Sequence, residues 1–114
     1  FIADADDNSV PDLAIVSANH GIIGWRLYSG ETNPGDDAVA PTDNYDITVL
    51  DEDGYDIACS LLLNRDTLNT EIVNIIAATP TREYPVVRGD LTVTVAGNSV
   101  ASATGKIVLV FKDN

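Results

Sequence analysis

The clearest alternation of hydrophobic and polar positions lies between Asn44 and Ile57. Apolar and polar side chains alternate from Tyr45 to Val49, and this period of two places the apolar ones on one face of a strand. Asp53-Gly54 follows, and this pair favours a tight turn because glycine adopts positive φ freely and aspartate tolerates it. The alternation resumes from Tyr55 to Cys59. The stretch therefore predicts a β-hairpin that turns at Asp53-Gly54.

Other apolar segments predict strands along the rest of the chain. They are Leu13 to Val16, Ile22 to Tyr28, Ile72 to Ala77, Leu91 to Val95 and Ile107 to Phe111. In the last of them Val108 and Val110 are apolar too, so we expect a second sheet to cover one face and a partner to cover the other. Before Ile72, Asp66 or Thr67 offers the N-cap of a short helix, but the β-branched residues that follow favour the strand.

Turn-forming residues separate these segments. Turns are predicted at Ser17 to Gly21 and at Ala96 to Ser99, and a loop is predicted from Thr79 to Pro85. The longest loop is predicted from Ser29 to Asn44, because it contains Asn33-Pro34-Gly35 and a second proline. A long loop on a β scaffold is a common place for contacts with a partner.

Short strands, turn residues between them and no long helical pattern predict an all-β protein. We expect roughly six to eight strands in an antiparallel β-sandwich or a small β-barrel. The 114 residues suit one domain, numbered 1–114, with an acidic turn at residues 1–12 and the long loop at 29–44.

The charge of the chain narrows the classes of partner. Eighteen acidic residues against six basic ones give a formal net charge of −12. Nucleic acids and anionic membranes attract clustered lysine and arginine, so neither is an expected partner. Solubility is the simplest explanation of the acidity, and docking on a basic partner or collecting divalent cations are alternatives.

The reactive residue types are scarce. Cys59 is the only cysteine, so an internal disulfide is impossible, and we expect a buried, inert thiol in the return strand of the hairpin. His20 is the only histidine, without a serine elbow or an acidic partner around it. The many carboxylate pairs lie in turns such as Asp51 to Asp53 rather than in an apolar cleft. The sequence therefore predicts no enzyme, no catalytic residue and no cofactor beyond a calcium ion.

The calcium hypothesis rests on the acidic turn at residues 1–12, where oxygen ligands recur at short spacing as in loops that wrap Ca²⁺. These ligands are Asp4, Asp6, Asn8 and Asp12. The match to an EF-hand loop is poor, because Ser9 stands where the sharp turn needs glycine and Ile15 stands where a bidentate glutamate belongs. The alternative is a solvated acidic turn that holds no metal.

Trp25 is the only tryptophan, and its expected role is an anchor in the packing of the core. The alternative is a stacking platform for a sugar, shared with Tyr28 or Tyr55. Together with the acidic turn, that alternative describes a calcium-dependent carbohydrate-binding module.

Five stretches, which cover most of the chain, have a familiar pattern of strand and turn residues: Ala40 to Ile57, Asn64 to Thr67, Gly89 to Val110, Ser9 to Leu13 and the triplet Asn33-Pro34-Gly35. Together they resemble a family of small virion-associated structural proteins of tailed bacteriophages. All of these are turn and strand motifs. The chain departs from the family pattern at Ser60 to Leu63, where glycine-rich sequence is more usual. The three leucines there are expected to enlarge a buried contact, either within the core or between subunits.

The resemblance implies a part of a phage particle, and we favour a capsid decoration or cement protein on the head exterior. Its expected partners are the major capsid protein or other virion proteins, together with further copies of itself in a closed homo-oligomer. A tail or head-tail accessory protein is the alternative. The residues expected to contact partners are Trp25, Tyr28, Pro34, Leu61, Leu62 and Leu63.

Overall fold

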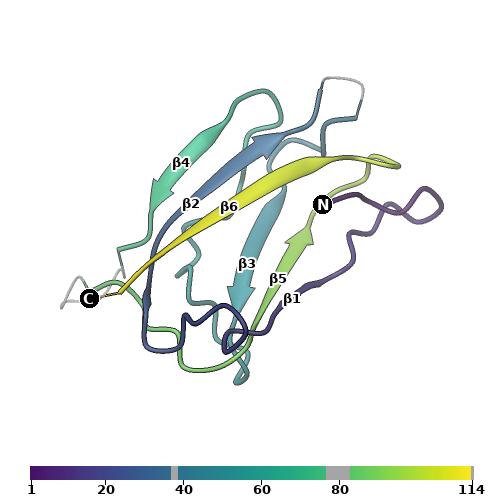
Figure 1. The fold of residues 1–114 in the computed structure, drawn as a ribbon. Helices are drawn as coiled ribbons and strands as arrows, with labels where there is room; N and C mark the ends of the chain where they lie inside the picture. The colour runs from purple at the N-terminus through teal and green to yellow at the C-terminus, as the bar shows by residue number, and fades with distance from the viewer. Residues whose placement is uncertain (37–38, 77–82, 114) are drawn as a thin grey trace.

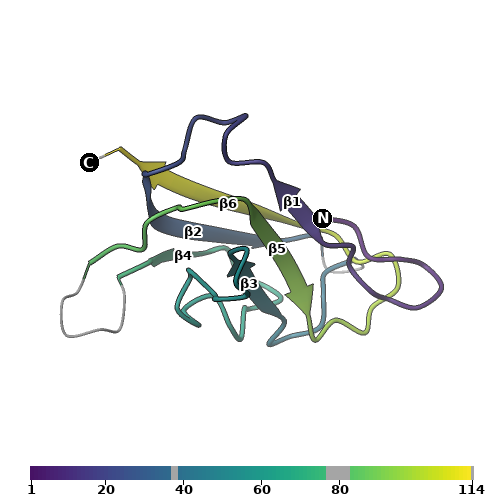
Figure 2. The same cartoon turned by 90° about the horizontal axis from the view of Figure 1, so that it is seen from below.

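The computed structural model describes residues 1–36, 39–76 and 83–113, and they form two three-stranded antiparallel sheets that face one another (Figures 1 and 2). The strands are β1 (Leu13–Ile15), β2 (Arg26–Pro34), β3 (Asp46–Leu50), β4 (Glu71–Asn74), β5 (Leu91–Ala96) and β6 (Gly105–Lys112). One sheet has the order β1-β5-β3 and the other the order β4-β2-β6. The prediction of an all-β antiparallel sandwich is confirmed. The described residues contain no helical segment with the length and hydrophobicity of a membrane span.

The core lies between the two sheets and follows the alternation seen in the sequence. Ile47 pairs with Val95 and Val49 with Val93, and all four side chains are buried. From the other sheet Leu27 is fully buried. Because side chains alternate across a strand, each sheet presents one apolar face to the other, and this burial is the main stabilising contribution.

The central hairpin is correct in its first strand, which is β3, and at its turn. Gly54 has a φ of +80°, and the Asp51 N–H donates to the Tyr55 carbonyl oxygen at 2.9 Å. The predicted return strand from Tyr55 to Cys59 is wrong: a single bridge joins Leu50 and Asp56, and β3 pairs with β5 instead.

The Asp56 carboxylate explains why the return strand stops. One oxygen accepts the N–H of Val49 at 2.9 Å and of Ala58 at 3.0 Å, and the other accepts the N–H of Ser60 at 2.9 Å. A side chain that accepts hydrogen bonds from nearby backbone N–H groups competes with the hydrogen bonds between strands. The chain after Asp56 therefore forms turns instead of a strand. Cys59 lies in these turns at a φ of +55° and is partly exposed, which corrects the prediction of a buried thiol in a strand.

The long loop predicted from Ser29 to Asn44 is wrong over its first half, because β2 continues to Pro34. Its polar residues form a strand because β2 is central and receives ladder hydrogen bonds from both β4 and β6. The predicted strand from Ile22 begins late, at Arg26, after a turn in which Gly24 has a φ of +84°.

Most of the other predicted strands are confirmed. The segments at β1, β5 and β6 form where alternation predicted them, and β4 covers the first part of the segment expected from Ile72 to Ala77. Ala77 and residues 79–82 of the predicted loop lie outside the described residues.

Tyr45 is fully buried beside Thr32 and Arg65, and burial raises the pKa of its phenol above the ordinary value of 10.0. The neutral phenol is therefore favoured in the folded state, and unfolding at a pH above about 10 releases a proton. We expect the free energy of unfolding to fall as the pH rises from about 9 to 11, and to fall less in Tyr45→Phe. Urea unfolding across that range tests this, and equal pH slopes for the two proteins would contradict it.

Candidate functional site

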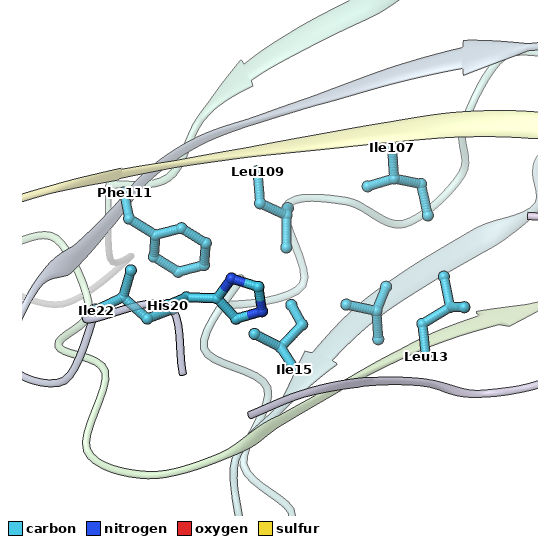
Figure 3. A pocket seen from close by; sticks show the side chains of 8 residues that line it. Leu13, Ile15, His20, Ile22, Ile107, Leu109 and Phe111 are labelled. Atoms are coloured by element: carbon cyan, nitrogen blue, oxygen red, sulfur yellow. The ribbon is translucent and has the colours of Figure 1, made fainter. Parts of the chain in front are cut away.

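An open apolar groove runs between the edge strands β1 and β6, which lie on the same side of the sandwich (Figure 2). The volume of the groove is about 420 Å³. Figure 3 shows the side chains that line it: Leu13, Ile15, His20, Ile22, Val93, Ile107, Leu109 and Phe111. A second hollow, beside Tyr55 and Cys59, has about half that volume, about 200 Å³.

Two strand patterns build the walls of the groove. In β6 every second side chain, from Ile107 through Leu109 to Phe111, faces inward and is only partly buried. In β1, Leu13 pairs with Val93 and shares its face, but the strand has only three residues. The short β1 leaves part of the inner face of β6 without a covering strand, so Leu13 remains 43% exposed.

Phe1 packs on the start of β6, two residues before Ile107 of the groove. Its nitrogen donates to the Gly105 carbonyl oxygen at 2.7 Å, and the Gly105 N–H donates to the Phe1 carbonyl oxygen at 3.2 Å. The Phe1 ring occupies the space over Gly105 that a Cβ would need, and its centroid lies 6.2 Å from that of Tyr45. The close approach explains the glycine at this position.

The chemistry of the groove is that of an apolar binding surface. Among its lining side chains only His20 carries ionisable or hydrogen-bonding atoms. The imidazole lies between Phe111 and Ile15 (Figure 3). The other seven side chains are apolar, so the lining offers mainly hydrophobic contact to a ligand.

The aromatic residues singled out from the sequence do not form one platform. Trp25 is partly buried and packs against the core, as expected for a packing anchor. Tyr28 lies 4.8 Å from Tyr84 between ring centroids, and the Lys112 ammonium sits 3.4 Å above the Tyr28 ring, which is a cation–π contact. Tyr55 lines a separate cavity of about 200 Å³, and Trp25 lines neither cavity.

The three leucines that were predicted to contact a partner differ in how deeply they are buried. Leu62 is fully buried and points at Gly30, where an added Cβ would lie 2.9 Å from both of its methyl carbons. The prediction that Leu62 contacts a partner is therefore wrong; it is a core residue. Leu61 and Leu63 are partly buried, and Pro34 ends β2 opposite Gly105.

The acidic turn folds around its own backbone. The Asp4 carboxylate accepts the N–H groups of Asp6 at 2.7 Å and Asp7 at 3.3 Å. The Asp7 carboxylate accepts the N–H and hydroxyl of Ser9, and these bonds lower the pKa of Asp7. Within the described residues no three His, Cys, Asp or Glu side chains converge as metal ligands. Calcium binding by Asp4, Asp6, Asn8 and Asp12 stays a prediction.

Comparison of the chain with protein-family models, with curated proteins and with solved structures finds no match. The geometry of the described residues therefore carries the functional argument. The groove itself was not predicted as a site. The only sign of it in the sequence is that odd and even positions from Ile107 to Phe111 are all apolar, so both faces of β6 carry apolar side chains.

Proposed function

We propose that this protein is a structural component of a phage particle, most simply a capsid decoration or cement protein. It would stabilise the head by binding capsid subunits and further copies of itself. The resemblance of its turn and strand motifs to virion-associated proteins supports the proposal, and so does the outer face of the β4-β2-β6 sheet.

That outer face is the observation on which the proposal chiefly rests. Thr32 is buried and pairs with Glu71, and Gly30 packs on Leu62, so the neighbouring Ile72 points outward. Ile72 is 71% exposed, and Val108 and Val110 of β6 share its face through the register with β2.

A sheet face that exposes apolar side chains suits docking on another protein. The face is mixed in character, because Glu31 of β2 lies between Ile72 and Val108 in the register. The sequence-based expectation that a partner covers the second face of β6 agrees with the exposure of Val110. A tail or head-tail accessory role would use the same face.

Capsid addition tests the proposal. We expect the purified protein to form a stable oligomer of the 12.1 kDa chain and to add stoichiometrically to capsids that lack it, measured by light scattering and sedimentation. Ile72→Lys is expected to weaken addition by about tenfold or more, since burying one such side chain contributes about 1.5–3 kcal/mol.

Leu68→Lys is the matched control, because Leu68 is also 71% exposed but lies outside the β4-β2-β6 sheet. Its addition to capsids should match that of the wild type. A monomer that does not bind capsids would overturn the proposal. An equal loss of capsid addition in both variants would show that the face of the β4-β2-β6 sheet is not the contact surface.

A further inference from the structure

We propose that the open edge of β6 accepts an extended segment of a partner polypeptide as an added antiparallel strand, whose alternate apolar side chains fill the groove. This inference goes beyond the proposed function and does not depend on it. It concerns the edge and inner face of β6, whereas the proposed capsid contact uses the outer face of the sheet.

The chain itself begins such a strand on this edge. Ile2 forms an antiparallel bridge with Thr104, and the Ala3 N–H donates to the Ala103 carbonyl oxygen at 2.8 Å. With the two bonds between Phe1 and Gly105, these residues form a short ladder at the start of β6. The edge is therefore competent to pair, and the direction of pairing is antiparallel.

Past Phe1 the same edge is open in the described part of the chain. Gly105 directs its N–H and carbonyl at Phe1, so the period of two directs those of Ile107, Leu109 and Phe111 to the same side. On the other side β6 pairs with β2 along its whole length. An edge with unpaired donors and acceptors is a template for another strand, and strand addition is a recurring mode of peptide recognition.

The groove has room for the inward-facing side chains of that strand. The Phe1 ring faces inward over Gly105, and residues paired across a ladder share a face. Residues opposite Ile107, Leu109 and Phe111 would therefore also face inward. A cavity of about 150 Å³ holds one benzene-sized group. The 420 Å³ of the groove then has room for about two or three apolar side chains.

Charge complementarity favours a partner segment with acidic ends over a second copy of this chain. Lys106 and Lys112 flank the open stretch and are exposed, in a chain whose net charge is −12. Antiparallel pairing of two β6 strands centred on Leu109 would place Lys106 of one copy opposite Lys112 of the other, which is repulsive. A segment with acidic residues at both ends and apolar residues at alternate positions complements the edge.

The probe is a labelled heptapeptide that matches Lys106 to Lys112, with glutamate at both ends, leucine at positions two, four and six, and threonine between. We expect saturable binding to the purified protein by fluorescence anisotropy. Amide hydrogen exchange of Ile107, Leu109 and Phe111 should slow by about tenfold or more on binding. The amides of Val108 and Val110 should not change, because they already bond to β2.

Methylated peptides separate strand addition from simple apolar adsorption. N-methylation at positions two, four and six removes the donors that face β6 and should weaken binding by about tenfold or more. N-methylation at positions three and five should leave binding unchanged. Equal affinity of the two methylated peptides, or unchanged exchange at Leu109, would overturn the proposal.

Variants of the groove provide the second test. Leu13→Lys places a charge in the lining and should weaken peptide binding by about tenfold. Val16→Lys is the control, because Val16 has the same 43% exposure as Leu13 and does not line the groove. Without peptide, a dimer whose Leu109 amide is protected would identify the occupant as a second copy and overturn the proposal of a partner segment. Failure of capsid addition would leave all these outcomes unaffected.

Discussion

Leu62→Ala is expected to lower the free energy of unfolding by about 2–5 kcal/mol, the cost of a cavity at a fully buried leucine. The side chain contacts the backbone of β2 at Gly30, so its loss opens a space beside the central strand of the sheet. Urea unfolding of the purified protein measures the change through its midpoint. A loss smaller than about 1 kcal/mol would contradict the placement of Leu62 in the core.

Gly30→Ala supplies a coupled test of the same contact. Alone it should destabilise the protein, because its Cβ would lie 2.9 Å from the Leu62 methyl carbons and overpack the site. In the Leu62→Ala background that Cβ enters the vacated space. We expect the double variant to be more stable than the sum of the single losses predicts, by about 0.5–3 kcal/mol. Additive losses would show that the two residues are not in contact.

Asp56→Ala is expected to lower the free energy of unfolding by about 1–3 kcal/mol. Its carboxylate is the acceptor for three backbone N–H groups, and the methyl group of alanine accepts none. One of these donors, the Val49 N–H, belongs to the core strand β3, so the loss should extend beyond the local coil. Urea unfolding and amide exchange at Val49 are the measurements.

Asp53→Ala is the control for that experiment. Asp53 lies in the same turn, and its side chain is exposed. Removing it lowers the local negative charge by the same amount as Asp56→Ala but breaks no contact with β3. Its unfolding midpoint should match that of the wild type. An equal loss in both variants would attribute the effect of Asp56→Ala to charge rather than to hydrogen bonding.

Alternation predicted the strands that have one clear apolar face. The sequences around β3 and β5 gave correct elements because their inward residues bury against one common core. The return strand after Gly54 failed although its alternation was equally regular. The Asp56 carboxylate prevents a second strand there, because it accepts hydrogen bonds from backbone N–H groups on both sides of itself.

Neither the extent of β2 nor the groove could be predicted, because both depend on strands from distant parts of the chain. Ser29, Glu31 and Asn33 have weak strand preference, and they are held in a strand by neighbours from distant parts of the chain. The groove depends on β1 standing beside β6, which follows from strand order alone. Neither local propensity nor the spacing of apolar residues contains that order.

The strand order also determines how the chain reaches its fold. The four pairings are β1 with β5, β3 with β5, β2 with β4 and β2 with β6, and in none of them are the two strands consecutive in the chain. No isolated hairpin can nucleate either sheet, so long loops must close before any ladder forms. Such topologies fold in milliseconds to seconds. On the ribosome β2 can pair with β4 early, whereas β1 and β3 have no partner strand until β5 emerges, and the second sheet is complete only once β6 has been made.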